Sequence, residues 1–506
     1  MAQYTQNMKV KIFDIEAGKL ISVINETDAK ELGIFPLDRV EIFNPKTKKS
    51  LVTVIDVTDS MVKENVVGIF EDVRKVLKVK DLDTVEVKAV ERPQSVAFIK
   101  KKMDKKRLSF EEIKAIVDDL ASNRLSEIEA SAFMSAVYIN GFDLDETVAM
   151  TKALFLNGKQ LAIKNGPVLD KHSVGGTNGR ATMIIVPIVA AAGYCIPKTS
   201  SRSITSAAGT ADAMEVLCDV TLTLEEIKEI TERVGGVLAW GGAVDLAPAD
   251  DKIIKIEHPL SLDPEGQVIA SVMAKKASVG AKYVVIDLPV GPDVKVGSKE
   301  RAEDMALKFI EVGKKLGIRI ECVLTDGTEP SGKAFGPALE AKYVMEILEG
   351  KFFDNLAKKS CELAGALFEL VGDSKKGRGY EKARNILESG KALKKMKEII
   401  KAQNGKIFNS EDIKLAKFRR GIKAEKSGEI KSINVRLLND IARLAGAPAD
   451  KKAGVMLSAE AGQHVKKGAV LFEIHAENKR KLELAERYAK KTEAVELDKV
   501  VLEKFA

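Results

Sequence analysis

The sequence predicts a multidomain protein of the α+β and α/β classes. We expect a small N-terminal β-rich domain, a helical domain, an α/β domain and a C-terminal α+β, barrel-sandwich-like domain. The 506 residues exceed what one hydrophobic core usually supports. The spacing of apolar residues also changes near residues 93, 166 and 416, and a change of period marks a change of secondary structure. A hydrophobic share of 45% beside a charged share of 31% is typical of a folded globular chain.

Residues 1–92 are predicted to form the β-rich domain. Apolar and polar residues alternate at residues 40–43 and 51–55, which indicates half-buried strands. Helical spacing occurs only near residues 29–32 and 71–77. Pro93 follows the last strand-like run, so we place a domain boundary there.

Residues 95–165 are predicted to be helical. Ser109 with Glu112, and Ser126 with Glu129, have the spacing of a capping box, and each pair precedes an apolar stretch of helical period. In a capping box the side chains of the serine and the glutamate each accept a hydrogen bond from the other residue's backbone N–H. These two N–H groups would otherwise have no partner at the start of the helix. The segment therefore contains two predicted helix starts.

Beyond residue 166, short apolar runs alternate with helical stretches. Residues 283–286 and 318–324 are predicted strands, and residues 300–316 and 337–348 are predicted helices. This alternation predicts an α/β domain with a largely parallel sheet. After about residue 416 the chain becomes strand-rich again. There, residues 462–468 resemble a barrel-sandwich turn. Residues 455–457 offer no lysine where a lipoyl or biotinyl carrier would present one, so we expect a structural module.

Composition excludes several classes of function. The net charge of +7 is spread over 81 basic and 74 acidic residues, and only 5% of residues are aromatic, which disfavours nucleic acid as a partner. No apolar run approaches the roughly 20 residues that span a bilayer, so we expect no membrane partner and a cytoplasmic location. No metal-ligand spacing occurs, and no C-x-x-C pair is formed by the four cysteines, Cys195, Cys218, Cys322 and Cys361.

Residues 170–179, Asp-Lys-His-Ser-Val-Gly-Gly-Thr-Asn-Gly, lie between a short apolar run and a predicted helix. Glycine lets the backbone approach an anion, a helix start supplies free N–H groups, and Lys171 adds a full charge, so this loop is suited to phosphate. It matches neither the Walker A nor the Rossmann pattern, which disfavours ATP and NAD. An ordinary tight connection is the alternative.

A second polar cluster covers residues 199–206 and combines six hydroxyls with the guanidinium of Arg202. Such a density of donors suits the recognition of an oxyanion. The alternative is that these hydroxyls bond to their own backbone, as loop serines and threonines often do.

The order and spacing of these motifs resemble the thymidine and pyrimidine-nucleoside phosphorylases from about residue 100 to the C-terminus. Further motifs match in register, at residues 208–210, 246–250, 269–271, 275–276, 294–297 and 325–327. Within that family, this chain resembles the archaeal AMP phosphorylases in its extra N-terminal domain and in the sequence Ser-Arg-Ser-Ile-Thr-Ser of residues 201–206.

The resemblance implies a helical domain (residues 95–165 with about 246–278) and an α/β domain (residues 166–245 with about 279–415) that enclose a cleft, as in the type II nucleoside phosphorylases. It implies a C-terminal domain at residues 416–506 and a homo-oligomer, a dimer or larger, through residues 1–92. It further implies phosphorolysis of AMP, with CMP and UMP as further candidates, to free base and ribose 1,5-bisphosphate. Inorganic phosphate is the co-substrate, and no cofactor is implied.

The resemblance also implies the site residues. Positions that match phosphate ligands are Lys171, Ser173, Thr182, Ser200 and Thr210. Positions that match nucleotide ligands are Gly175, Ser201, Arg202, Ser203, Ile204, Thr205, Ser206, Thr210, Ser271, Lys275 and Lys295.

Asp263 matches the proposed donor of a proton to the leaving base. It needs a pKa raised by burial or by a nearby carboxylate, and a simple turn with Pro264 is the alternative. His172 is the second candidate acid, because the ordinary pKa of histidine is about 6.5. It could equally position the loop.

Glu257 or a close neighbour stands where the pyrimidine enzymes place an arginine that reads the base, and one residue is missing before Asp263, which disfavours a pyrimidine nucleoside as substrate. Three rival functions stay open: a pyrimidine nucleoside phosphorylase, a phosphoribosyltransferase and a non-catalytic nucleotide-sensing assembly protein. A phosphoribosyltransferase would need acidic ligands for magnesium pyrophosphate.

Overall fold

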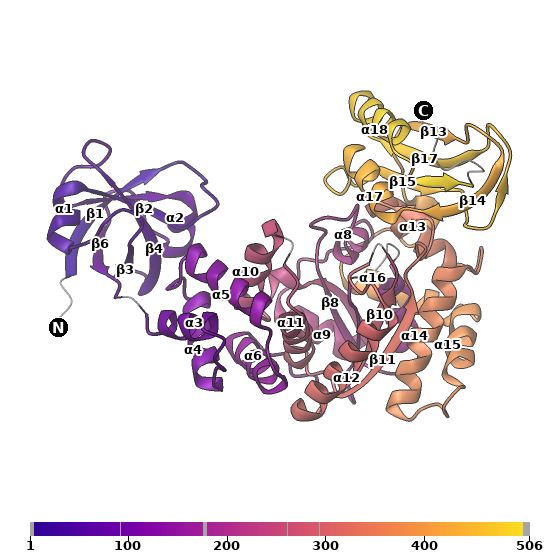
Figure 1. The fold of residues 1–506 in the computed structure, drawn as a ribbon, viewed down its shortest axis with the longest axis horizontal. Helices are drawn as coiled ribbons and strands as arrows, with labels where there is room; N and C mark the ends of the chain where they lie inside the picture. The colour runs from indigo at the N-terminus through magenta and orange to yellow at the C-terminus, as the bar shows by residue number, and fades with distance from the viewer. Residues whose placement is uncertain (1–4, 92, 176–179, 261, 293, 499–506) are drawn as a thin grey trace, which may run out of the picture. The chain divides into compact units, whose positions relative to one another are not determined.

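The computed structural model describes residues 5–91, 93–175, 180–260, 262–292 and 294–498, and Figure 1 shows the course of the chain. The chain divides into two compact units. The first comprises the residues up to 157 with residues 248–270, and the second comprises residues 158–247 with the residues from 271 onward.

A closed six-stranded barrel opens the first unit. Its strands, in spatial order, are β1 (Thr5–Phe13), β5 (Val66–Phe70), β2 (Ile21–Asn25), β4 (Lys49–Thr58), β3 (Arg39–Asn44) and β6 (Thr84–Ala89). Alternate residues such as Met8, Val40 and Ile42 point inward and form the core. Closure pairs β6 with β1, so no strand edge is left open. The strands and both helices predicted here are present, the helices as α1 (Glu26–Leu32) and α2 (Glu71–Leu77).

The rest of the first unit is helical. Its helices are α3 (Ser95–Met103), α4 (Phe110–Ala121), α5 (Glu127–Asn140), α6 (Leu144–Asn157), α10 (Pro248–Glu257) and the first half of α11 (Glu265–Ser278). The short 3-10 helix η2 (His258–Leu260) follows α10. Both predicted capping boxes are confirmed, at the starts of α4 and α5.

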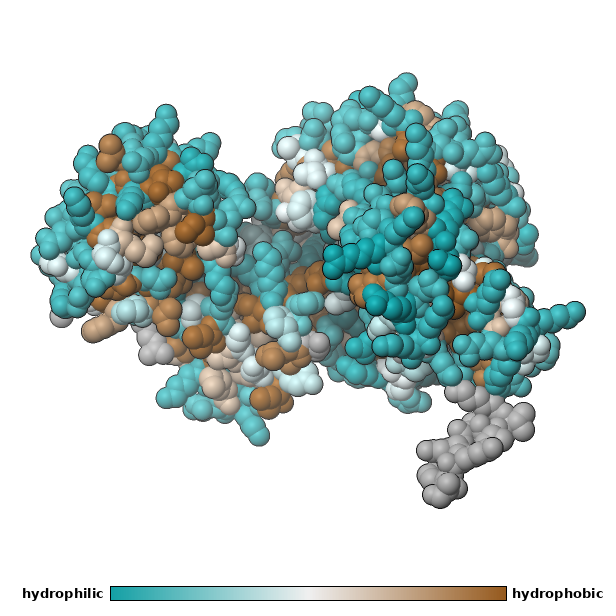
Figure 2. All heavy atoms as spheres, turned by 90° about the horizontal axis from the view of Figure 1, so that it is seen from above, coloured by the Kyte–Doolittle hydropathy of each residue, from teal (hydrophilic) through white to brown (hydrophobic). Residues whose placement is uncertain are grey.

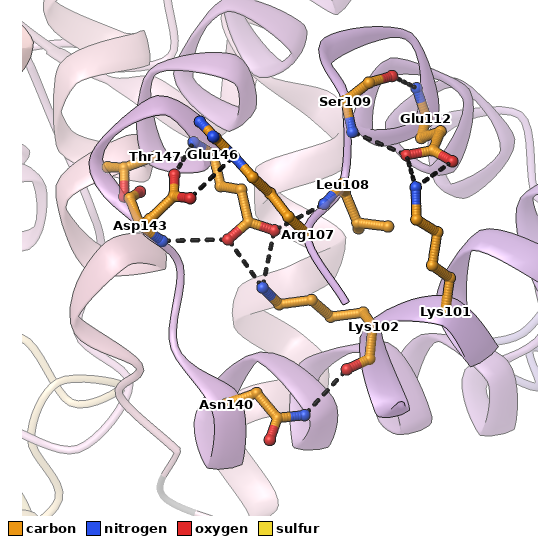
Figure 3. A network of polar contacts seen from close by, with 10 residues as sticks. All are labelled: Lys101, Lys102, Arg107, Leu108, Ser109, Glu112, Asn140, Asp143, Glu146 and Thr147. Atoms are coloured by element: carbon orange, nitrogen blue, oxygen red, sulfur yellow. Dashed lines mark hydrogen bonds and ion pairs between the residues drawn. The ribbon is translucent and has the colours of Figure 1, made fainter. Parts of the chain in front are cut away.

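A buried ion pair joins α3 to α6 (Figure 3). Lys102 Nζ lies 2.7 and 2.8 Å from the two carboxylate oxygens of Glu146. The same carboxylate accepts from the backbone N–H groups of Leu108 at 2.9 Å and Asp143 at 3.1 Å. The burial of both charges is therefore compensated by attraction and by further hydrogen bonds.

The second unit contains parallel sheets. One has the order β11 (Arg319–Asp326), β10 (Tyr283–Val290), β7 (Leu169–Ser173), and the other pairs β8 (Ile196–Ser200) with β9 (Gly236–Trp240). A hydrogen bond of 2.8 Å from Leu169 N to Cys195 O links them. The parallel sheet predicted from the sequence is confirmed, and the carboxyl ends of β7, β10 and β11 meet at one edge.

Helices of the second unit supply most of its core. They are α7 (Ala181–Ala191), α8 (Thr210–Met214), α9 (Leu224–Val234), α12 (Lys299–Leu316), α13 (Pro337–Leu348), α14 (Asn355–Val371), α15 (Gly379–Glu388) and α16 (Lys391–Ala402). The 3-10 helices η1 (Gly241–Ala243) and η3 (Ser410–Asp412) lie in connecting segments. Helix α7 is buried nearly all round, because it packs between α14, α16 and the sheet.

The C-terminal segment has α+β content, as predicted. One antiparallel sheet has the order β12 (Ala334–Phe335), β15 (Gly454–Leu457), β17 (Val470–Ala476), β13 (Phe418–Lys423), and another has the order β16 (His464–Val465), β14 (Gly428–Ile433), β18 (Val495–Leu497). Helices α17 (Val435–Leu444) and α18 (Lys479–Lys491) pack on them. Strand β12 comes from a segment that the sequence assigned to the α/β domain, and two residues are too few to show a strand period.

The surface is mainly hydrophilic, with apolar side chains scattered among polar ones (Figure 2). On the barrel, Phe35, Leu37 and Leu82 are each about 70% exposed. Among the helices in the described ranges, none is long and apolar enough to cross a membrane.

Candidate active site

The side chain of Lys171 lies buried near the carboxyl end of β7. Its Nζ donates to Ser173 Oγ, which lies two residues on and therefore on the same face of the strand. Ser173 Oγ in turn donates to Asp287 Oδ2 on β10 at 2.5 Å, and Thr325 at the end of β11 donates to Asp287 Oδ1 at 2.6 Å. The structure thus joins the two predicted phosphate residues of β7 to a buried carboxylate that the sequence pattern did not indicate.

Positive charge exceeds negative charge around this carboxylate. Lys359 Nζ on α14 lies 3.3 Å from Asp287 Oδ2, and Lys171 Nζ lies 3.9 Å from the same oxygen. A second carboxylate, that of Asp170 on β7, lies 2.5 Å from Lys276 Nζ and 3.7 Å from Lys198 Nζ. Four largely buried lysines therefore surround two buried aspartates, an arrangement suited to a doubly charged anion.

The pKa values reflect this crowding. Burial lowers the pKa of Lys171 to about 8, with the positive charges of Lys359 and Lys276 adding to the effect and Asp287 opposing it. Burial likewise lowers the pKa of Lys198 to about 7. Burial by itself raises the pKa of Asp287, but the charges of Lys171 and Lys359 reverse that effect and hold it below its usual value. Asp287 therefore stays ionised, whereas two of the lysines titrate near neutral pH.

His172 lies beside the same lysines. Burial, followed by the charges of Lys276 and Lys198, lowers its pKa well below the usual value. At neutral pH the ring is uncharged and provides no imidazolium to donate a proton, so its environment suits a positioning role better than that of an acid.

Gly175 and Lys295 lie in direct contact. Gly175 has a φ of +61°, and a Cβ there would overlap Cβ and Cγ of Lys295. The site therefore requires glycine for conformation and for space. These two predicted nucleotide residues are brought together although 120 residues separate them. The rest of the predicted glycine loop, residues 176–179, lies outside the described residues.

Arg202 is paired within the protein. Its guanidinium makes two hydrogen bonds to the Glu215 carboxylate, at 2.8 and 2.6 Å, and lies 3.6 Å from Asp212. It also stacks over the Trp240 ring at 4.8 Å from the ring centroid. Arg202 thus fixes the start of the hydroxyl-rich loop, which we define as residues 201–209.

Some hydroxyls of this loop bond to its own backbone. Ser203 Oγ donates to Ser206 O, and Ser206 Oγ donates to Ala208 O at 3.0 Å. Ser201, Ile204 and Thr205 are exposed. The loop thus combines internal hydrogen bonds with a polar exposed tip.

The remaining predicted phosphate residues lie around the same loop. Ser200 ends β8, and Thr210 is the first residue of α8. Thr182, in the first turn of α7, is buried. Arg180 precedes that turn and donates to Ala208 O at 2.8 Å, which links the start of α7 to the end of the loop.

Ser271 and Lys275 lie on α11, four residues apart and therefore on one helix face. The charge of Lys275 also contributes to the lowered pKa of His172, so it acts on the β7 cluster. Asp263 lies just before α11, in the first unit, and is exposed. Within the described ranges, no group of three or more His, Cys, Asp or Glu side chains could hold a metal ion.

Comparison with known proteins gives consistent matches. The helical bundle domain of a glycosyl transferase family matches residues 96–156, and the a/b domain of a glycosyl transferase family matches residues 165–393. The pyrimidine nucleoside phosphorylase C-terminal domain matches residues 429–496.

Two curated relatives are AMP phosphorylases. That of Methanothrix thermoacetophila is 44% identical over 97% of this chain and 96% of its own length. That of Pyrococcus furiosus is 45% identical over 98% of each. Among solved structures, anthranilate phosphoribosyltransferase from Thermus thermophilus has a TM-score of 0.51 at 21% identity, over 61% of this chain and 99% of that chain, and it shares the fold.

Proposed function

The chain belongs to the AMP phosphorylase family, and from this premise we propose that it cleaves AMP with inorganic phosphate to adenine and ribose 1,5-bisphosphate. The observation that supports this most strongly is the excess of buried positive charge at the carboxyl edge of the parallel sheet, around Lys171 and Asp287. Open α/β sheets bind their ligands at this edge.

Phosphate is the nucleophile in this proposal. Lys171 supplies the ammonium group that binds it, together with the hydroxyls of Ser173, Thr182, Ser200 and Thr210. As the bond from C1′ to the base breaks, positive charge develops on the ribose, and a phosphate held beneath the ring stabilises it. Catalysis then consists of positioning and electrostatic stabilisation rather than a covalent enzyme intermediate.

The leaving base needs a proton. We assign this role to Asp263, because His172 is uncharged at neutral pH and a neutral imidazole is too weak an acid. Ser271 and Lys275 are assigned to the base. Gly175, Lys295 and residues 201–206 are assigned to the rest of the nucleotide, with the loop hydroxyls at the 5′-phosphate.

This proposal includes the four domains with the residue ranges predicted from the sequence. It also includes the cleft between the helical and α/β domains and the barrel-sandwich-like arrangement of the C-terminal domain. A cytoplasmic location and catalysis without a cofactor are further parts of it. We assign oligomerisation to the N-terminal barrel, because the exposed apolar side chains of Phe35, Leu37 and Leu82 would be buried favourably against a second copy.

The test is release of free base from AMP, CMP, UMP, adenosine and thymidine by the purified protein, each with and without inorganic phosphate. Phosphate-dependent release from AMP but not from adenosine is expected, and CMP and UMP define the base range. Release only from thymidine would indicate a pyrimidine nucleoside phosphorylase. AMP binding without release from any substrate would indicate a nucleotide-sensing protein.

A further inference from the structure

The hydroxyl-rich loop is held by the C-terminal helix α17. Arg443 Nη1 donates to Ile204 O at 2.9 Å and to Ser206 O at 3.3 Å. Asn439 Oδ1 accepts from Ala207 N at 2.8 Å. Arg443 and Asn439 are four residues apart and share one helix face. That face therefore binds three backbone groups of the loop.

The helix is a fixed support for these contacts. Asn439 Nδ2 donates to Val435 O at 2.9 Å, which leaves Oδ1 as the acceptor for the loop. On its other face, Leu438, Ile441 and Ala442 are buried in the C-terminal core. Movement of the loop therefore requires the loss of these hydrogen bonds or the displacement of a packed helix.

These contacts also set the direction of a backbone donor. In a trans peptide, the carbonyl and the N–H of the next residue point in opposite directions. Because Ile204 O points at Arg443, the N–H of Thr205 points away from α17. Thr205 is exposed, and an outward backbone N–H beside hydroxyl groups can bind a phosphate oxygen.

A second C-terminal contact reaches the start of the loop. Lys451 Nζ lies 2.6 Å from the Glu215 carboxylate that binds Arg202. Hydrogen bonds from Arg202 and then Lys451 lower the pKa of Glu215 to about 2, so this carboxylate stays charged. The C-terminal segment therefore restrains the loop at Arg202 and again at residues 204–207.

We propose that Asn439 and Arg443 are positioning residues for the nucleotide. They hold the hydroxyl-rich loop in the conformation in which its tip binds the 5′-phosphate, and they do not contact the nucleotide themselves. This inference rests on the proposed function, which makes the nucleotide the ligand of the loop.

The test compares wild type with Arg443→Ala, Asn439→Ala and Arg443→Lys. Arg436→Ala is the matched control, because Arg436 is an exposed arginine of the same helix. We expect the KM for AMP to rise about tenfold or more in Arg443→Ala, because both charged hydrogen bonds from Arg443 to the loop are lost, while the KM for phosphate changes less than about twofold. Arg443→Lys restores part of the affinity. Equal rises in both KM values, or none, would overturn the inference.

A measurement that does not need turnover separates this inference from the proposed function. Hydrogen–deuterium exchange at residues 201–209 is expected to be faster in Arg443→Ala than in wild type or Arg436→Ala, and calorimetry is expected to show weaker AMP binding. If wild type releases no base, the proposed function fails, and these two readouts still decide the role of Arg443. Unchanged exchange and unchanged AMP binding would refute it.

Discussion

Asp287→Asn is the most informative perturbation of the proposed phosphate site. The substitution keeps the size of the side chain and removes its charge. Asp287 Oδ2 lies 3.9 Å from Lys171 Nζ, and both groups are buried. The carboxylate is the main influence that keeps Lys171 protonated against burial and the neighbouring lysines.

The strength of the attraction between Lys171 and Asp287 follows from this distance. At an effective dielectric constant of about 20, two unit charges about 3.9 Å apart attract each other by about 4 kcal/mol. That energy corresponds to a factor of about 10³ in the protonation equilibrium of Lys171. Since the pKa of Lys171 is about 8 in the wild type, removal of the Asp287 charge would lower it to well below neutral pH.

In the proposed site it is the ammonium form of Lys171 that binds phosphate, so in wild type this contribution is present below about pH 8 and is lost as the pH rises through that value. In Asp287→Asn the same loss moves to lower pH. At pH 7 the charged fraction of Lys171 falls from about nine-tenths in wild type to about one in a hundred in the variant, so the KM for phosphate rises by up to about 100-fold.

The assay is the initial rate of adenine release at saturating AMP, with phosphate varied, from pH 5.5 to 8.5. The ratio of the variant KM to the wild-type KM cancels the titration of phosphate itself, and it should shrink as the pH falls. Thr325→Val is the matched control, because it removes a 2.6 Å hydrogen bond to the same carboxylate but leaves the charge. A ratio near one at pH 7, or a large ratio that does not change with pH, would refute the electrostatic reasoning.

Three further predictions concern other parts of the chain. Glu146→Gln leaves the buried Lys102 without its counter-charge, so we expect a loss of about 3–5 kcal/mol in denaturant unfolding, whereas Arg107→Ala at the exposed side of that network should leave the midpoint nearly unchanged. Asp263→Asn should lower kcat about 100-fold or more with AMP binding within a few-fold; near-normal turnover would remove Asp263 as the acid. Gly175→Ala should raise the KM for AMP about tenfold, because its φ of +61° and its contact with Lys295 leave no room for a methyl group; an unchanged KM would separate this contact from nucleotide binding.

The sequence predicted those helices and strands whose signals lie within a few neighbouring residues. The capping boxes at Ser109 and Ser126 needed only residues three apart, and both formed as expected. The strands and helices of the barrel followed from short-range period in the same way. Strand β12 did not, because its two residues pair with β15 more than a hundred residues later.

The residues of the candidate site likewise fall into those with a local sequence signal and those without one. Lys171 and Ser173 were predicted because a strand, a glycine loop and a helix follow one another in the chain. Asp287 and Lys359 lie in an ordinary apolar strand and an ordinary helix, and nothing in their neighbours indicated them. For Arg202, the hydroxyl-rich sequence indicated a candidate ligand, but its pairing with Glu215 depends on folding and had no local signal.

The sequence by itself therefore determined the order and type of the domains, the motifs that carry the family resemblance and the residue types available for phosphate and nucleotide. These follow from periodicity, glycine placement and hydroxyl content, which are properties of neighbours along the chain. Only the tertiary structure decided which charges share one buried site and how strongly they alter one another's pKa. Burial and distance set those effects, and the parallel arrangement of β7, β10 and β11 brings Lys171 and Asp287 within 3.9 Å although 116 residues separate them in the chain.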